Sequence, residues 1–387
     1  MKKKIWLSAP YWSGREEQYI QAAVRDNWIA PGGPNVLELE KRVAEQAGRK
    51  YCKVVNSGTS ALHLSLLAFG IGPGNTVFCP GFTFAAVINP VIYTGATPVL
   101  IDCLPGTWNM DPDLLEEAIE DLTKNPPHDD PPQKGKNCLI CVHNYGMPAD
   151  MDRLEKISAK YEMILIEDAS EAMGSRAGGL MAGGFGIASI FSFNGNKIVT
   201  ASTGGAELSD QRIIVDRVEY LAGQARDRDK PYYHSAEVGY NYQLSNINAG
   251  IALGQLETLA ERVERKRQIA AFYRKHLEDI PGISFQEEPA GVVSNHWLSC
   301  ILIDPVKTGG VDRDNVYRAL MAENIESRYV WKPLHLQPAY SRFRHFGRGV
   351  AESMFSQGLC LPSGAGLTEE DLERITEVVI VELKKMN

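Results

Sequence analysis

The stretch Ile164–Asp168 (ILIED) is a short apolar run that ends in two acids. A second run, Ile190–Lys197 (IFSFNGNK), passes from mostly apolar residues through a small polar turn to a lysine. Short runs rich in Ile, Leu and Phe, bounded by turn residues, are typical of strands that are buried on both faces. We therefore expect both runs to lie in a covered sheet, with Asp168 and Lys197 near the ends of their strands.

Similar apolar runs alternate with helical patterns from about residue 50 onward. Seven strands are predicted: the two above, taken as 163–167 and 189–193, together with Cys52–Val55, Thr76–Cys79, Thr97–Ile101, Cys138–His143 and Ala206–Leu208. Helical patterns at 61–69, 111–122 and 151–160 separate several of them. This alternation predicts an α/β fold with a mainly parallel, seven-stranded sheet sandwiched by helices. The segment 123–137, which is rich in proline and charge, is predicted to be a surface loop.

The C-terminal third of the chain has a different pattern. Apolar residues recur at helical spacing over Ile247–His276, which predicts one long helix that bridges two domains. A strand at Trp297–Asp304, a helix at Asp312–Glu323 and a final helix at Thr368–Lys385 follow. We therefore expect a large α/β domain over residues 1–250 and a smaller α+β domain over residues 251–387.

Composition excludes several classes of protein. The formal charge of −8 over 387 residues leaves no basic stripe for a nucleic acid, and no apolar stretch is long enough to cross a membrane. Seven cysteines, an odd number, are typical of reduced thiols, so the expected location is the cytoplasm. Cys138 and Cys141 should point to opposite faces of one strand, and no second cluster completes a metal site with them.

The segment Val54–Leu62 (VVNSGTSAL) is predicted to be a strand, a tight turn and the start of a helix. Backbone amides at a helix N-terminus, the unhindered Gly58 and the hydroxyls of Thr59 and Ser60 could bind a phosphate. Taken alone, the same residues are better explained as a plain helix cap. The segment matches neither a Walker loop nor GxGxxG, which disfavours a nucleoside triphosphate enzyme or a nicotinamide dehydrogenase.

Asp168 and Lys197 give this phosphate turn its chemical meaning. A carboxylate at a strand end can keep a pyridinium nitrogen protonated, and a lysine amine can form a Schiff base with an aldehyde. Each residue has an ordinary alternative, because Asp168 could cap the following helix and most lone lysines are solvated. The order phosphate turn, acid, lysine nevertheless predicts pyridoxal phosphate as the cofactor.

The chain also resembles a known family, the aminotransferases of the DegT/DnrJ/StrS group, which are fold-type I pyridoxal phosphate enzymes acting on nucleotide-linked keto sugars. The resemblance extends over nearly the whole chain. It rests on collinear segments: Trp28–Pro34, Asn56–Leu62, Pro80–Phe84, Val142–Gly146, Glu167–Ala172, Phe191–Lys197, Gly239–Asn246 and Pro333–Pro338.

The resemblance implies a role for each matching residue. Lys197 is the Schiff-base lysine and the proton shuttle, and Asp168 pairs with the ring nitrogen. The other implied cofactor contacts are Phe84 and Ser170 on the ring faces, Glu171 at the ring hydroxyl, Thr59, Ser60 and Ser192 with Gly58 at the phosphate, and Asn241 from the other subunit of a homodimer. Glu171 departs from the His or Gln of many relatives, which leaves its role open.

The segments around Lys197 and Pro333–Pro338 are most similar to enzymes that aminate carbon 4 of UDP-2-acetamido-2,6-dideoxy-4-keto-hexose, for bacillosamine-like sugars, with L-glutamate as donor. The candidate substrate residues are Trp28, Arg226, Lys332 and His335, although the last two could lie in a packed loop and Arg226 in a solvated charge run. Alternatives are a dTDP- or GDP-linked keto sugar aminated at carbon 3 or 4, another pyridoxal phosphate enzyme of this fold, and a non-catalytic regulator that senses a sugar nucleotide.

Overall fold

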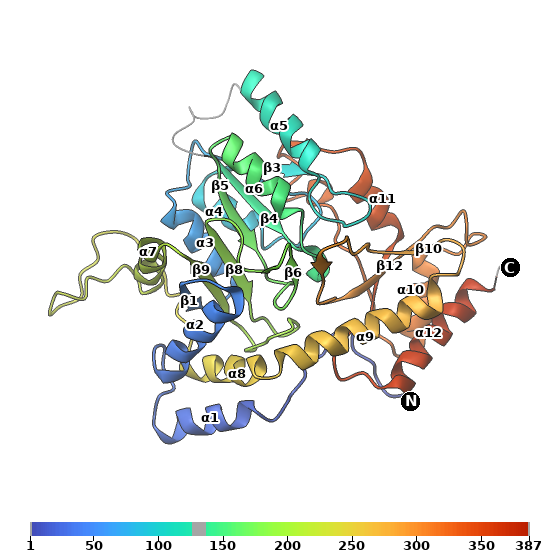
Figure 1. Cartoon of the computed structure of the whole chain (residues 1–387), viewed down its shortest axis with the longest axis horizontal. Helices are drawn as coiled ribbons and strands as arrows, with labels where there is room; N and C mark the ends of the chain where they lie inside the picture. Colours follow the sequence, from blue (N-terminus) through green and yellow to red (C-terminus); the bar gives the residue numbers. More distant parts are fainter. Residues whose placement is uncertain (1, 126–136, 386–387) are drawn as a thin grey trace.

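The computed structural model describes residues 2–125 and 137–385, so most of the predicted surface loop lies outside it (Figure 1). Its centre is an eight-stranded sheet in the order β1-β9-β8-β5-β4-β2-β3-β14, in which β9 is antiparallel to both neighbours and the other pairs are parallel. The strand bounds are β1 Tyr51–Val55, β2 Thr76–Pro80, β3 Thr97–Ile101, β4 Cys138–Val142, β5 Ile164–Asp168, β8 Ala188–Ser192, β9 Gly205–Ser209 and β14 His345–Phe346.

All seven predicted strands are present, but the prediction of seven strands in the sheet is wrong by one. The eighth strand, β14, extends the sheet beside β3. It has only two residues and comes from a distant part of the chain, so no local apolar run in the sequence predicts it.

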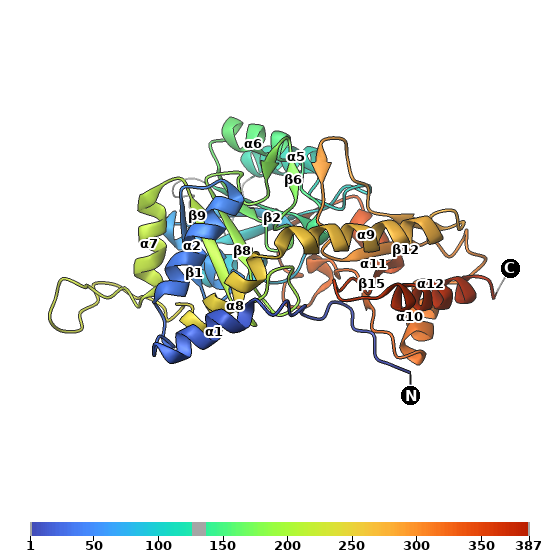
Figure 2. The ribbon, with the colours of Figure 1, turned by 60° about the horizontal axis from the view of Figure 1, so that its bottom comes forward.

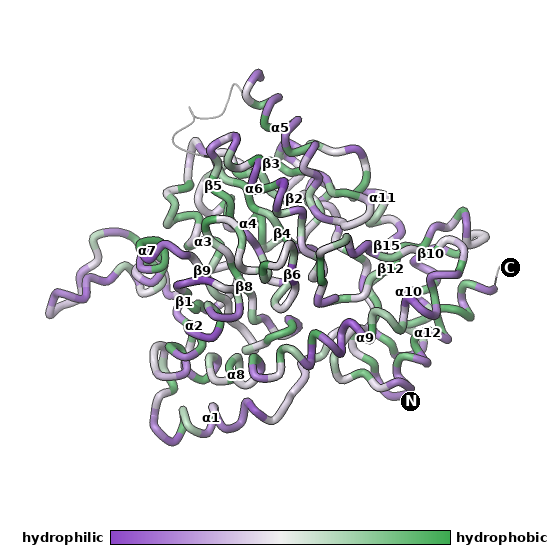
Figure 3. The backbone as a smooth tube through the Cα atoms, in the orientation of Figure 1, coloured by the Kyte–Doolittle hydropathy of each residue, from purple (hydrophilic) through white to green (hydrophobic). Residues whose placement is uncertain are grey.

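Helices cover both faces of this sheet. One face packs against α3 (Gly58–Ala68), α4 (Ile88–Thr94) and α7 (Arg212–Ala222), and the opposite face against α5 (Pro112–Lys124) and α6 (Met151–Lys160). Cys138 belongs to the first of these cores and Cys141 to the second, which confirms that the two thiols point to opposite faces. Figure 3 shows hydrophobic residues concentrated in the central strands that these helices enclose.

A four-stranded antiparallel sheet, in the order β10-β12-β15-β13, forms a second layer. It packs against α9, α10 and α12 in a separate core, which also takes in Ile5 from the N-terminal segment. The bounds are α9 Leu259–Leu277, β10 Ile283–Phe285, β12 Ser299–Ile303, α10 Arg313–Ala322, β13 Arg328–Tyr329, β15 Gly358–Leu361 and α12 Glu369–Leu383. The division of the chain near residue 250 stays a prediction.

The prediction of one helix over Ile247–His276 is wrong. The chain forms α8 (Asn246–Leu256) and α9, with a break at Glu257 and Thr258 (Figure 2). The Arg262 guanidinium donates to the Gln255 carbonyl (2.8 Å) and to the Thr258 hydroxyl (2.6 Å). The first bond satisfies a backbone carbonyl at the end of α8 that a continuous helix would have paired itself, and the second ties the guanidinium to the side chain at the break.

The remaining elements complete the molecule around these layers. They are α1 Glu16–Arg25, α2 Pro34–Ala47, α11 Val350–Gln357, the short helices η1 Asn144–Gly146 and η2 Leu334–Leu336, and a small sheet of β6 Arg176–Ala177, β7 Leu180–Met181 and β11 Val292–Val293. Among the described helices, none has a stretch apolar and long enough to serve as a membrane span.

Candidate active site

A cavity of about 330 Å³ lies at the carboxyl ends of β5 and β8, where ligands bind in parallel sheets. Eight of the residues predicted to contact the cofactor line it: Gly58, Thr59, Phe84, Asp168, Ser170, Glu171, Ser192 and Lys197. Residues as far apart in the sequence as Gly58 and Lys197 therefore meet at one site, as the order of the sequence motifs predicts.

Asp168 is the last residue of β5 and is only 6% exposed. Burial raises the pKa of its carboxyl group, while hydrogen bonds from Ser170 and the charge of Lys197 act in the opposite direction. Its Oδ1 accepts a hydrogen bond from the Ser170 backbone N–H (3.0 Å). A protonated ring nitrogen facing this carboxylate would stabilise the ionised form, so the acid suits the predicted cofactor.

Lys197 reaches the same cavity from the turn after β8. Its Nζ lies 3.2 Å from Glu171 Oε1 and 4.1 Å from the centre of the Trp297 ring. Glu171 is held in place because its Oε2 accepts from the Tyr145 backbone N–H (2.8 Å). Burial raises the pKa of Glu171, and the neighbouring Lys197 ammonium lowers it. The amine therefore has an aromatic face on one side and a carboxylate on another.

At one end of the cavity, the backbone at the start of α3 is open enough for a ligand to come close to it. Ser57 caps the helix, because its Oγ accepts from the Ser60 backbone N–H (3.0 Å). A Cβ added at Gly58 would lie 2.9 Å from the Ser192 Cβ, so any larger residue would close this end of the cavity. Gly58, Thr59 and Ser192 thus present small side chains and free helix-end amides, which suit a phosphate.

Ser60 is buried within the cap and is not among the residues that line the cavity. Its hydroxyl donates to Asn56 Oδ1 (2.7 Å) and lies 2.8 Å from the Ser57 Oγ. In this single chain the residue therefore supports the turn, and its predicted phosphate contact stays a prediction.

The other predicted residues also lie outside the cavity lining. The carbonyl of Asn241 accepts from Asn56 Nδ2 (3.4 Å), and the exposed Trp28 contributes its carbonyl to Asn246 Nδ2 (2.8 Å). The Arg226 guanidinium stacks on the Tyr233 ring at 4.1 Å. The carbonyl of Lys332 accepts from Gln337 Nε2 (2.8 Å), and the His335 ring bonds to Glu352 (2.9 Å). The fold of this chain does not bring these five residues to the cavity.

Two tryptophans in the cavity wall were not predicted from the sequence. Trp297 precedes β12, and its Nε1 donates to the carbonyl of Asn196 (2.8 Å), the residue before Lys197. Trp331 follows β13 and lies 5.3 Å from Phe84, ring centre to ring centre. Both come from the second layer, and only the packing of that layer against the large sheet brings them here.

Comparison with known proteins identifies the family. Residues 11–380 match the DegT/DnrJ/EryC1/StrS aminotransferase family. The chain belongs to this family. EpsN of Bacillus subtilis strain 168, provisionally named a pyridoxal phosphate-dependent aminotransferase, is 43% identical, over 100% of this chain and 98% of its own. GDP-perosamine synthase of Escherichia coli O157:H7 is 33% identical, over 97% of this chain and 98% of its own.

Solved structures agree with this membership of the family. DesI, determined in the presence of its TDP-sugar product, superposes with a TM-score of 0.87 at 28% identity, over 100% of this chain and 95% of its own. The fold-type I architecture and the aminotransferase activity predicted from the sequence are therefore confirmed.

Proposed function

We propose that this aminotransferase transfers the amino group of L-glutamate to a nucleotide-linked keto sugar, specifically to carbon 4 of UDP-2-acetamido-2,6-dideoxy-4-keto-hexose, for bacillosamine-like or other amino-sugar glycans. The observation that carries the transfer chemistry is the meeting of Asp168, Lys197 and the Gly58 turn in one cavity. The nucleotide sugar is supported by the descriptions of two relatives, a GDP-perosamine synthase and DesI, which was determined in the presence of its TDP-sugar product. The UDP carrier and carbon 4 rest on the motif resemblance around Lys197 and Pro333–Pro338.

Pyridoxal phosphate is the cofactor, and when bound it supplies an electron sink for the carbon that loses a proton. The Asp168 carboxylate holds the proton on the ring nitrogen, which keeps that sink effective. Phe84 and Ser170 would contact the ring, while Thr59, Ser192 and the amides at the start of α3 would bind the phosphate. The residues of this chain thus fix the cofactor at both ends before any substrate enters.

Lys197 would hold the cofactor through its aldehyde carbon, and its amine would be the group that moves protons during the reaction. In the first half of the cycle it would take the α-proton of L-glutamate. The amino group would stay with the cofactor, and water would supply the keto oxygen of the 2-oxoglutarate that leaves. In the second half Lys197 would return a proton to the sugar carbon that receives the amino group. Glu171 and Trp297 border the Nζ atom, so we infer that they limit the directions in which the free amine can swing.

Three further proposals follow from the same reasoning. The enzyme acts in the cytoplasm as a homodimer with shared sites; the dimer is supported because Asn241, Trp28 and Arg226 lie outside the cavity of their own chain. Residues 1–250 form the cofactor domain and 251–387 the smaller domain, which supplies the two tryptophans. A dTDP- or GDP-linked sugar is the alternative substrate, favoured by the names of the relatives above.

A substrate panel tests the proposed function. The purified enzyme with pyridoxal phosphate and L-glutamate is incubated with UDP-, dTDP- and GDP-linked keto sugars, and NMR assigns the aminated carbon. We expect an amine at carbon 4 of the UDP-linked acetamido sugar and one 2-oxoglutarate for each amine formed. Amination of only a dTDP- or GDP-linked sugar would overturn the UDP assignment, and failure to aminate any keto sugar while Lys197 binds the cofactor would favour the regulator.

A further inference from the structure

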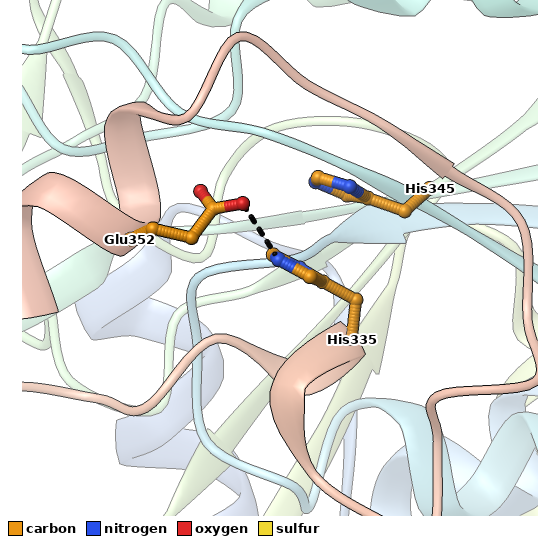
Figure 4. A group of neighbouring side chains, drawn as sticks. All are labelled: His335, His345 and Glu352. Carbon is orange, nitrogen blue, oxygen red and sulfur yellow. Dashed lines mark hydrogen bonds and ion pairs between the residues drawn. The ribbon is translucent and has the colours of Figure 1, made fainter.

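Three potential metal ligands meet at the edge of the large sheet, outside the cavity described above. They are His335 in η2, His345 in β14 and Glu352 in the first turn of α11. One donor atom of each lies within 4.8 Å of the donor atoms of the other two, a grouping found once within residues 2–125 and 137–385. Figure 4 shows the two imidazole rings face to face, with the Glu352 carboxylate facing the Nε2 atom of the His335 ring.

Several atoms of the group that could bind a metal have no partner. His335 Nε2 lies 2.9 Å from Glu352 Oε1, and the His335 and His345 ring centres are 3.7 Å apart at an interplanar angle of 15°. His345 Nε2, His335 Nδ1 and Glu352 Oε2 are buried and have no hydrogen-bond partner among the described residues. An ordinary ion pair between His335 and Glu352 accounts for one contact but not for the second imidazole stacked on it.

We propose that His335, His345 and Glu352 bind a divalent transition-metal ion of the Zn²⁺ class. Two imidazoles and one carboxylate, with a water as fourth ligand, form a donor set suited to zinc and its neighbours, whereas Ca²⁺ and Mg²⁺ prefer oxygen ligands alone. Two ligands of a tetrahedral zinc ion, each about 2.0 Å from the metal, lie about 3.3 Å apart. The 2.9 Å separation of His335 Nε2 and Glu352 Oε1 needs only a small opening to match this value.

Binding requires a second local change, at His345. The parallel rings direct their lone pairs in parallel, so the His345 ring must turn out of the stack for its nitrogen to converge on the ion. Glu352 has a 36% exposed side chain and His335 a 12% exposed one, so the ion enters from the Glu352 side. None of the three ligands lines the active-site cavity, so the ion would act as a structural clamp rather than in the transfer chemistry.

The position of the group indicates what this clamp would hold. The three ligands close the segment 335–352 onto the sheet, where β14 pairs with β3 through two residues only. At the start of the segment, the Leu334 backbone N–H donates to the Gly81 carbonyl (2.8 Å), and Trp331 in the cavity wall lies three residues before that. A bound ion would therefore stabilise β14 and the neighbouring wall of the active site.

Zinc binding to the intact holoenzyme tests the proposal. Protein freed of metal by a chelator and desalting, with its pyridoxal phosphate retained, is titrated with Zn²⁺ in a calorimeter and scanned for thermal unfolding. We expect one saturable site per chain and a rise in the unfolding temperature as the site fills. Co²⁺ in place of Zn²⁺ should give the visible absorption of a tetrahedral site with nitrogen and oxygen ligands.

Three variants separate this site from binding elsewhere. Glu352→Gln and His345→Gln should each weaken Zn²⁺ binding by about 100-fold or more and abolish the thermal shift. His296→Gln is the matched control, since His296 pairs with Glu288 at 3.2 Å but has no second imidazole, and it should retain the full stoichiometry. Absence of saturable binding in the parent enzyme, or equal affinity in Glu352→Gln, a conservative change on the exposed side of the group, would overturn the proposal.

Discussion

Replacing Asp168 with asparagine removes the negative charge at the buried end of the cavity but keeps the shape of the side chain. The Asn Oδ1 can still accept from the Ser170 N–H, so the turn after β5 should persist. A hydrogen bond between charged groups contributes about 1.5–3 kcal/mol, which corresponds to roughly 10- to 150-fold weaker binding of pyridoxal phosphate. Because the neutral amide cannot hold the ring nitrogen protonated, the turnover number should fall by a further factor of about 100 or more.

Two measurements separate the effect of Asp168→Asn on cofactor binding from its effect on the reaction rate. Titration of the cofactor-free variant with pyridoxal phosphate gives the dissociation constant, and stopped-flow absorbance with L-glutamate gives the rate of the first half-reaction. We expect a weaker dissociation constant, an altered absorption spectrum of the bound cofactor and a much slower first half-reaction, with an unchanged unfolding temperature of the cofactor-free protein. Parent-like affinity and rate in Asp168→Asn would refute the assignment of this acid to the ring nitrogen.

The remaining predictions concern the lysine, the cavity wall and a buried acid. Lys197→Ala should bind pyridoxal phosphate without a bond that borohydride reduces and should show no turnover, and retained turnover would exclude this lysine as the proton carrier. Trp297→Leu should lower the turnover number by about 3- to 30-fold through loss of the aromatic contact with Nζ, and Trp297→Phe should restore part of it, as steady-state kinetics would reveal. Burial without a hydrogen-bond partner raises the pKa of Glu207 to about 8, above its ordinary value of 4.5. Between pH 4.5 and 8, Glu207 is therefore protonated in the folded state and ionised in the unfolded state. The bound proton adds to the free energy of unfolding at low pH, and this contribution is lost as the pH rises through 8. Urea unfolding gives the free energy of unfolding of the parent and of Glu207→Gln at several pH values between 5 and 8. Plotted against pH, the two free energies should differ in slope by about 1.4 kcal/mol per pH unit, and equal slopes would contradict the buried, protonated acid.

The central sheet could be predicted because its strands are continuous apolar runs that need no distant partner to be seen. The same holds for Asp168 and Lys197, since Asp168 ends β5, Lys197 lies in the turn after β8, and the ends of neighbouring parallel strands meet at one edge. β14 could not be predicted in this way, because two residues carry no periodicity and their pairing with β3 depends on the folding of the whole chain.

Elements fixed by contacts between distant segments were missed for the same reason. The break between α8 and α9 is stabilised by Arg262, and the apolar spacing continues across it without interruption. Trp297 and Trp331 enter the cavity only because the second layer packs against the first. His335 was predicted as a substrate group from its motif, but its ring faces His345 and Glu352, and no local pattern relates these three residues.

The most direct test of the account is the covalent attachment of the cofactor. The holoenzyme is reduced with borohydride, digested and analysed by mass spectrometry for peptides that carry the pyridoxyl phosphate group. The account predicts a single modified residue, Lys197, in the peptide that follows β8, and no modification after addition of excess L-glutamate has converted the cofactor to its aminated form. Modification of another lysine, or none at all in a protein that binds the cofactor, would contradict it.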